Sequence, residues 1–240
     1  MTPLVLVHGF MGGSRQWDGY VGKLLKRRDL IAVDLPGFGA NAHLPPMSSI
    51  DGYADWVVQH VHGLGVESYH LLGHSMGGMI AQEIVRRDRE RVDRLLLYAT
   101  GAIGVLPGRF ETIEESKRRA AEDGPAATAR RIAATWFLAR EAANGYEKCA
   151  AIAAQTKLAA IQAGLDAMQS WSGMQKLQQI PQDTLILWGD RDRTYPWNQI
   201  QSLWQTIRNT SLAVVPGCAH AVHAEKPDLF QSLISDFLDR

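Results

Sequence analysis

Short apolar segments that alternate with amphipathic segments constrain the fold of this 240-residue chain more than any other feature. Apolar runs rich in Leu, Val and Ile occupy residues 4–7, 30–33, 69–72, 94–99, 184–188 and 212–215, and helical patterns occupy residues 17–27, 53–64, 76–87, 198–207 and 228–238. Strands that lack polar alternation are buried on both faces, which is typical of a parallel sheet. We therefore predict an α/β fold with a mainly parallel sheet and helices on both of its faces.

Residues 101–180 interrupt this alternation, because they contain no convincing strand. Apolar residues from Leu158 to Met168 recur every three or four positions, which marks one face of a helix. A helical segment between two strands of one sheet would lie over the carboxyl edge of that sheet, where open α/β sheets bind ligands. We predict a core formed by residues 1–100 and 181–240, with residues 101–180 as an inserted helical cap.

Composition argues against several classes of protein. Lys plus Arg and Asp plus Glu both number 25, so the formal net charge is zero, whereas nucleic-acid-binding proteins usually carry a basic surplus. No apolar run reaches the ~18 residues of a membrane span, and the N-terminus shows no export signal. Cys149 and Cys218 lie too far apart for CxxC spacing and predict no disulfide framework. We expect a cytoplasmic protein without nucleic-acid or membrane partners.

The segment Gly73-His74-Ser75-Met76-Gly77 matches the Gly-x-Ser-x-Gly pattern. It lies between a predicted strand and a predicted helix, which is the context that a nucleophile elbow requires. The flanking glycines let the backbone turn sharply, so that the serine projects from the sheet. Ser75 is therefore the candidate nucleophile, and its hydroxyl needs a base to remove the proton.

The base and the acid should follow the serine in the order acid, then histidine. His220, in the loop after the last predicted strand, is the candidate base, and His223 is its competitor. The spacing of these two histidines would also suit a metal pair, but no third ligand accompanies it, so we predict no metal. Asp190 and Asp192 both follow the preceding strand and could orient the imidazole. Spacing alone does not separate the two aspartates.

A glycine-rich segment, residues 8–13, follows the first predicted strand. It lacks the Gly-Lys-Ser/Thr sequence of a phosphate-binding loop. The alternative is an oxyanion hole, which needs one backbone N–H from this loop and one from the residue after the nucleophile. We predict that Phe10 and Met76 supply these two donors.

Several motifs together make the chain resemble the α/β-hydrolase superfamily: His8-Gly9-Phe10, residues 34–39, residues 73–78, Gly189-Asp190-Arg191-Asp192, and residues 217–220 followed by Glu225 and Pro227. The resemblance implies the α/β-hydrolase fold and a Ser75, Asp192, His220 triad, because the second acid of the Gly-x-x-Asp motif is the catalytic one in this superfamily. It also implies that the oxyanion donors are Phe10 and Met76.

Within the superfamily, the chain is similar to a group of 3-oxoadipate enol-lactonases, pimeloyl-carrier methyl esterases and menaquinone-pathway synthases. The first two cleave a lactone and an ester, and the third performs an elimination with the same triad. The resemblance thus implies a carboxylic ester hydrolase that acts on a small-molecule ester or lactone without a cofactor. A cofactor-free lyase, a C–C hydrolase and a small-molecule receptor are the alternatives. The Ser-Gly-Pro-Gly loop typical of C–C hydrolases is absent at residues 10–13.

The chain departs from the family pattern at three places. It begins directly in the first motif-bearing strand, it carries Asn41 where serine is frequent, and it carries Ala219 where a second glycine is common. None of these departures touches the predicted triad.

The inserted segment offers candidates for binding the substrate. Trp136, Phe137 and Trp171, with Phe10 and Met76, are expected to form an apolar acyl pocket. Four arginines could pair with a substrate carboxylate or be solvated helix charges: Arg109, Arg130, Arg131 and Arg140.

Overall fold

Six strands form one sheet in the computed structural model, which describes residues 1–106 and 111–240. They are β1 (Leu4–Val7), β2 (Leu30–Val33), β3 (Tyr69–His74), β4 (Val92–Tyr98), β5 (Asp183–Gly189) and β6 (Thr210–Val215). Every neighbouring pair runs parallel. All six strands lie where the sequence predicts them, with differences of one or two residues at their ends, so the predicted parallel sheet is confirmed.

The α-helices of the described residues cover both faces and one edge of the sheet. They are α1 (Gly22–Leu25), α2 (Ile50–Gly63), α3 (Met76–Arg87), α4 (Ile113–Asp123), α5 (Pro125–Thr135), α6 (Tyr146–Ala153), α7 (Leu158–Gln169), α8 (Trp197–Thr206), α9 (Val222–Glu225) and α10 (Pro227–Leu238). Short 3-10 helices are η1 (Ser14–Trp17), η2 (Gly39–Asn41), η3 (Arg140–Ala142) and η4 (Met174–Gln179). Within these described parts, no helix is both long and apolar enough to span a bilayer.

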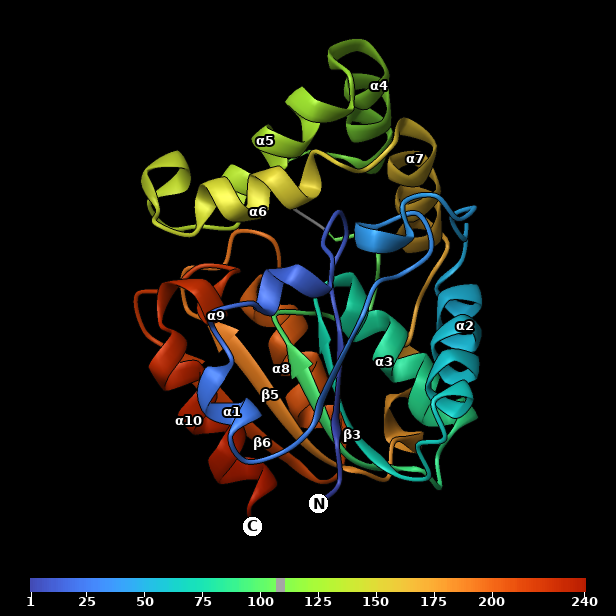
Figure 1. Cartoon of the computed structure of the whole chain (residues 1–240), viewed down its shortest axis with the longest axis vertical. Helices are drawn as coiled ribbons and strands as arrows, with labels where there is room; N and C mark the ends of the chain where they lie inside the picture. The colour runs from blue at the N-terminus through green and yellow to red at the C-terminus, as the bar shows by residue number, and fades with distance from the viewer. Residues whose placement is uncertain (107–110) are drawn as a thin grey trace.

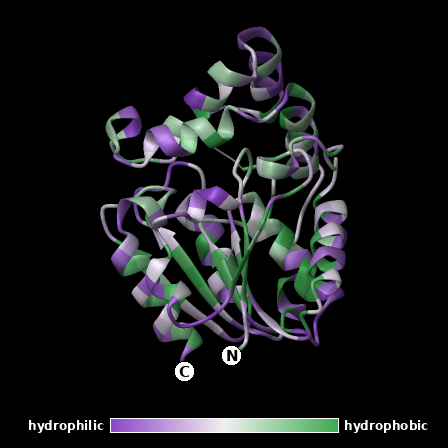
Figure 2. Ribbon diagram, in the orientation of Figure 1, coloured by the Kyte–Doolittle hydropathy of each residue, from purple (hydrophilic) through white to green (hydrophobic). Residues whose placement is uncertain are grey.

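Two separate hydrophobic cores explain why the strands are apolar throughout. Val5 and Val7 of β1 belong to a cluster that includes the inner faces of α2, α3 and α8. Leu4 and Leu6 point to the opposite face, where they pack in a second cluster with α1 and α10. Alternate side chains of a strand face opposite sides, so each face needs its own layer of helices. The central strands are accordingly green in the hydropathy colouring, while the helices carry purple segments (Figure 2).

The strand order β2-β1-β3-β4-β5-β6 creates a switch point between β1 and β3. The chain leaves β1 for β2 on one side, then returns to place β3 on the other side of β1. The connections therefore depart in opposite directions, and a crevice opens at the carboxyl ends of the two strands. This is the position at which a parallel sheet most readily binds a ligand.

The helices α4–α7, which we call the helical layer, lie between β4 and β5 in the chain and above the carboxyl ends of the strands (Figure 1). In this layer α4 packs on α7, and α5 packs on α6. Ile161 and Leu165, on the predicted apolar face of α7, are fully buried. The division into a core of residues 1–100 and 181–240 and a cap of residues 101–180 stays a prediction.

Glu83 of α3 holds the segment that follows the last helix of the helical layer. Its carboxylate accepts hydrogen bonds from Trp171 Nε1 (3.0 Å), Lys176 Nζ (2.8 Å) and Arg87 (2.9 Å). Burial alone would raise the pKa of Glu83, but these donors outweigh it and lower the pKa to about 2. The segment after α7 is thus held by an ionised carboxylate on the helix that follows Ser75.

Two predicted segments differ from the observed helices. The predicted helix 53–64 begins earlier, at Ile50, because the Ser49 hydroxyl caps it by accepting a hydrogen bond from Gly52 N (3.1 Å). Within the amphipathic stretch 17–27, the structure forms one short α-helix, α1, after the end of η1 at Trp17. Gly19, with φ of 79°, takes a left-handed conformation that interrupts the stretch.

The close approach of α3 to β1 gives a first prediction. A Cβ atom on Gly77 would lie 2.4 Å from Val7 O and 2.5 Å from His8 O, which are backbone atoms of the sheet. We expect Gly77→Ala to lower the free energy of unfolding by about 1–3 kcal/mol, measured by urea denaturation. Gly63→Ala is the matched control, because a Cβ there meets no atom within 4 Å. Equal urea midpoints for Gly77→Ala and wild type would contradict this account.

Candidate active site

Ser75 lies in a strained turn between β3 and α3. Its φ of 56° and ψ of −121° are unusual for a residue with a side chain and cost about 1–3 kcal/mol. The turn is held by hydrogen bonds from Ser75 N to Tyr98 O (2.9 Å), from Gly78 N to Ser75 O (2.8 Å) and from Thr100 Oγ1 to Ser75 O (2.7 Å). Gly73 permits it, since a Cβ there would lie 2.2 Å from Gly77 O. This is the geometry of a nucleophile elbow.

His220 and Asp192 meet in a buried hydrogen bond. His220 Nδ1 lies 2.8 Å from Asp192 Oδ2, and the two side chains are 2% and 0% exposed. The other carboxylate oxygen, Oδ1, accepts hydrogen bonds from Thr194 N (2.7 Å) and Tyr195 N (3.3 Å). Since an ionised carboxylate can only accept, the proton between the pair sits on Nδ1. Nε2 is then the nitrogen left to accept a proton.

Asp190 has a different neighbour. Its Oδ1 accepts a hydrogen bond from Gly217 N (2.7 Å), in the turn that precedes His220, and its Oδ2 lies 3.7 Å from Arg191. The structure therefore brings Asp192, and not Asp190, to the imidazole of His220. Asp190 instead stabilises the loop that carries His220, through its hydrogen bond with Gly217 N.

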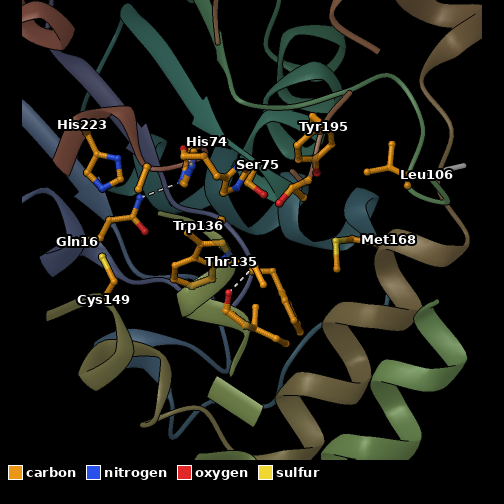
Figure 3. Close-up of a pocket in the computed structure, with 17 residues that line it drawn as sticks. Gln16, His74, Ser75, Leu106, Thr135, Trp136, Cys149, Met168, Tyr195 and His223 are labelled. Atoms are coloured by element: carbon orange, nitrogen blue, oxygen red, sulfur yellow. Dashed lines mark hydrogen bonds between the residues drawn. The ribbon is translucent and has the colours of Figure 1, made fainter. Parts of the chain in front are cut away.

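Ser75 and His220 line one cavity under the helical layer, together with Phe10 and Trp136. Figure 3 shows Ser75 and Trp136 in this cavity. Within the described residues, the Ser75 hydroxyl and His220 form no hydrogen bond. A nucleophile and its base are often apart in the free enzyme and approach when the substrate binds. The strained serine and the oriented histidine thus face the same enclosed space.

The backbone N–H groups of Phe10 and Met76 are both without a hydrogen-bond acceptor among residues 1–106 and 111–240. Met76 is the first residue of α3, and first-turn N–H groups have no partner inside the helix. Phe10 lies in a loop that is closed by Gly12 N donating to Gly9 O (3.0 Å). Two unpaired donors, one of them at the N-terminus of α3, favour a developing negative charge.

Three buried histidines lie beside the loops that carry Ser75 and His220, and burial keeps these three neutral: His8, His74 and His223. His8 Nε2 accepts from Leu35 N (3.0 Å), and its other nitrogen lies 2.7 Å from Gly9 O. Burial lowers the pKa of His8 and holds the pKa of His74 well below its usual range. His223 is affected in the same way, with a pKa lowered to about 3 by burial and by the neighbouring His220.

The carbonyl oxygen of His220 is fixed from two sides. His74 Nε2 lies 3.3 Å from it, and Tyr98 Oη lies 3.1 Å from it. The His74 ring stacks on Tyr98 with centroids 4.4 Å apart. Sequence reasoning missed both residues as supports of His220, because their positions beside it depend on contacts more than a hundred residues apart.

Glu225 and Arg193 join the histidine loop to the helical layer. Glu225 accepts hydrogen bonds from Ala219 N and Leu138 N, both at 2.6 Å. Arg193 donates to Phe137 O (2.9 Å) and Leu138 O (3.2 Å). The backbone at residues 137–138 is therefore held by side chains next to Asp192 and His220. Glu225 belongs to a motif seen in the sequence, but its partner across the chain gave no signal there.

The residues expected to bind substrate divide into two groups. Trp136 and Phe10 line the cavity. Phe137 instead packs in a hydrophobic cluster with α6, and the Trp171 indole N–H donates a hydrogen bond to the Glu83 carboxylate. The arginines that are described lie elsewhere as well. Arg130 pairs with Glu147, Arg131 pairs with Glu111, and Arg140 begins η3. Arg109 lies outside the described residues.

Cys149 also lines the cavity, and its thiol is a second candidate nucleophile beside the Ser75 hydroxyl. Burial raises the pKa of its thiol to about 11, so it stays protonated at neutral pH. A thiol is a weak nucleophile until it loses its proton.

The part of the chain that the structure describes holds no cluster of three His, Cys, Asp or Glu side chains suited to a metal ion.

A strained serine lies on the elbow, a histidine is hydrogen-bonded to an aspartate, and two unpaired N–H groups lie at the carboxyl edge of a parallel sheet. This is the arrangement of an α/β-hydrolase. The family model described as "Alpha/beta hydrolase family" matches residues 4–231. The chain therefore belongs to the α/β-hydrolase family, and it is an enzyme of that superfamily. The resemblance and the fold class predicted from its motifs are confirmed.

Relatives with several activities match almost the whole chain. The pimeloyl-[acyl-carrier protein] methyl ester esterase of Nitrosomonas europaea is 28% identical over 244 residues, covering 95% of this chain and 92% of the relative. The 2-hydroxymuconate semialdehyde hydrolase of Pseudomonas sp. strain CF600 is 28% identical over 251 residues, covering 98% and 86%. The crystal structure of the enol-lactonase from Burkholderia xenovorans LB400 aligns with a TM-score of 0.90 at 21% identity, covering 100% and 92%.

The different partners of the two aspartates give a second prediction. Asp192→Asn should lower kcat/KM for an ester by about 10²–10⁴-fold, because the amide no longer fixes the imidazole tautomer. Asp190→Asn should lower it less than about tenfold, since an amide oxygen can still accept from Gly217 N. Steady-state kinetics on folded variants, checked by circular dichroism, measure both effects. The reverse ranking of the two variants would show that Asp190 is the acid.

The buried neutral histidines give a third prediction, on stability. The unfolded chain protonates His223 below pH ~6.5, but the folded protein does so only near the lowered pKa of about 3. The unfolded state thus binds more protons in this window, so stability is full above pH ~6.5 and is lost as the pH falls. We expect His223→Gln to remove up to about 1.4 kcal/mol per pH unit from the slope of unfolding free energy between pH 6 and 4.5. Urea titrations at several pH values test this, and an unchanged slope would contradict it.

Proposed function

We propose that the protein hydrolyses a small-molecule carboxylic ester or lactone through a triad of Ser75, His220 and Asp192. The observation that carries this proposal is the buried hydrogen bond from His220 to Asp192, beside a serine held in an elbow. The esterase relative from Nitrosomonas europaea supports the ester class of substrate.

In the first half of the reaction, the oxygen of Ser75 attacks the carbonyl carbon while Nε2 of His220 takes its proton. Phe10 N–H and Met76 N–H bind the oxyanion, and a donor of this kind is worth about 10²–10³ in rate. Asp192 stabilises the charged imidazole without taking its proton. The C–O bond then breaks, and His220 gives the proton to the leaving oxygen.

In the second half, a water molecule attacks the ester formed on Ser75. His220 accepts the proton of the water, the acyl–oxygen bond to Ser75 breaks, and the proton passes to the serine. The products are the carboxylic acid and the alcohol, which remain one molecule when the substrate is a lactone. The mechanism draws on no metal or organic cofactor.

The helical layer acts in this proposal as the cap, and it excludes bulk water from the acyl-enzyme. Leu106, Ile132 and Met168 contribute an apolar lining to the cavity, which suits a hydrocarbon chain. The partner is therefore a small molecule and not a nucleic acid or a membrane. The two unpaired, buried cysteines accord with the cytoplasmic location that we propose.

Cleavage of a carbon–carbon bond by the same triad is the second candidate. The relative named 2-hydroxymuconate semialdehyde hydrolase favours it, because that relative matches 98% of this chain. Against it stands the loop at residues 10–13, which lacks the Ser-Gly-Pro-Gly sequence typical of C–C hydrolases. A lyase or a receptor would likewise give no ester turnover.

The fourth prediction tests the proposed activity. Wild-type protein should hydrolyse p-nitrophenyl esters of short acids, and Ser75→Ala should lower kcat by several orders of magnitude. A serine-directed phosphonate should abolish the activity with one equivalent bound, and chelator should leave the rate unchanged. Ser202→Ala, on the exposed side of α8, is the matched control and should retain wild-type activity.

Two results would overturn the proposal. Loss of activity in chelator, restored by a divalent metal, would show metal-dependent hydrolysis. Turnover of a 2-hydroxy-6-oxo dienoate without turnover of any ester or lactone would favour C–C cleavage.

A further inference from the structure

The cavity beside Ser75 has two chemically different sides. In the close-up view, Leu106 and Met168 lie on one side of Ser75, while Gln16, Cys149 and His223 lie on the other (Figure 3). The apolar side suits the hydrocarbon part of a substrate. The mechanism proposed above uses none of the polar groups on the other side.

His223 carries an unsatisfied polar atom at this polar side. Its side chain is almost completely buried, and Nε2 has no hydrogen-bond partner among the described residues. The other ring nitrogen, Nδ1, is engaged by Tyr98 Oη at 2.9 Å. The ring is fixed further by Trp17, with centroids 5.1 Å apart. A buried polar atom without a partner is costly, so a ligand that pairs with it gains affinity.

Gln16 brings a second polar group to the same side. Its side-chain nitrogen lies 3.3 Å from His74 Nδ1, and the His74 ring lies 5.5 Å from the His223 ring, centroid to centroid. The amide has both a carbonyl and an NH₂ group, so it retains hydrogen-bonding capacity beyond this one contact. Gln16 and His223 therefore flank His74 at one end of the cavity.

The charges of this side restrict the ligand. The cavity lining, as far as the described residues show it, contains no Lys, Arg, Asp or Glu. Burial also keeps His223 neutral at physiological pH. A carboxylate or ammonium group placed here would lose its hydration without a compensating charge.

A hydroxyl group fits these conditions best. Tyr98 has one proton, which it can give either to His220 O or to His223 Nδ1. In the first case His223 Nε2 is an acceptor, and in the second it is a donor. A hydroxyl serves both cases, because it donates and accepts.

We propose that Gln16 and His223 form a specificity subsite for an uncharged hydroxyl group of the substrate, so that the preferred substrates are hydroxylated esters. This inference rests on the proposed ester hydrolysis at Ser75 and adds the class of substrate to it. The hydroxyl lies on the part of the substrate that points away from Leu106 and Met168.

The test compares matched esters with and without the hydroxyl. Methyl 3-hydroxybutanoate with methyl butanoate probes the acyl part, and 2-hydroxyethyl butanoate with propyl butanoate probes the alcohol part. The readout is the ratio of kcat/KM for the hydroxylated ester to kcat/KM for its partner, followed by pH-stat. Comparing this ratio between variants cancels the intrinsic reactivity of each ester.

We expect His223→Phe to lower the ratio about ten- to hundredfold for one of the two pairs, since a buried hydrogen bond is lost. Gln16→Leu should lower the same ratio, and it carries the test if His223→Phe does not fold. His70→Phe is the matched control. His70 is also buried with an unpaired ring nitrogen, but it lies in β3 away from the cavity, so its ratio should equal that of wild type.

Three results would overturn the subsite. A wild-type ratio equal to that of base-catalysed hydrolysis for both pairs would show that no hydroxyl is recognised. Equal losses on both members of a pair, in either variant, would show a structural role only. If wild type cleaves neither member of either pair and the phosphonate leaves Ser75 unlabelled, the proposed function itself fails, and the subsite fails with it.

Discussion

The hydrogen bond between His220 Nδ1 and Asp192 Oδ2 is the contact on which the rest of the site depends. It requires the loops after β5 and β6 to lie side by side, which the parallel pairing of these strands provides. The remaining oxygen of Asp192 is occupied by two backbone N–H groups, so the carboxylate cannot turn away. An imidazole held in this way has only Nε2 free to act as a base.

The sheet lies below the contact between His220 and Asp192, and the helical layer lies above it. The switch point between β1 and β3 presents Ser75 and the loop with Phe10 at the same edge. Above it, Glu225 and Arg193 fix the backbone at residues 137–138 next to the histidine loop, while Glu83 fixes the segment after the layer to α3. A shift of the helical layer would therefore change the contacts of both α3, the helix that follows Ser75, and the loop that carries His220.

The sequence predicts the parts of this arrangement that depend on local patterns. The apolar strands, the helix α3 and the elbow around Ser75 follow from periodicity and from glycines, and the structure has them at the predicted places. Spacing alone left Asp190 and Asp192 equivalent, because the choice depends on which carboxylate reaches His220 across 28 residues. The contacts of Gln16, Tyr98 and Glu225 could not be predicted from the sequence for the same reason. Their partners are distant in the chain, and a polar residue with a distant partner leaves no periodic trace.

The most direct test of the account is a mass measurement on the protein during turnover of a slowly deacylating ester. The account predicts that rapid acid quenching leaves protein heavier by one acyl group, and that peptide mapping places this group on Ser75. The thiol of Cys149 should stay unmodified, since burial keeps it protonated. Ester turnover without any covalent adduct, or with the acyl group on Cys149, would contradict nucleophilic catalysis by Ser75.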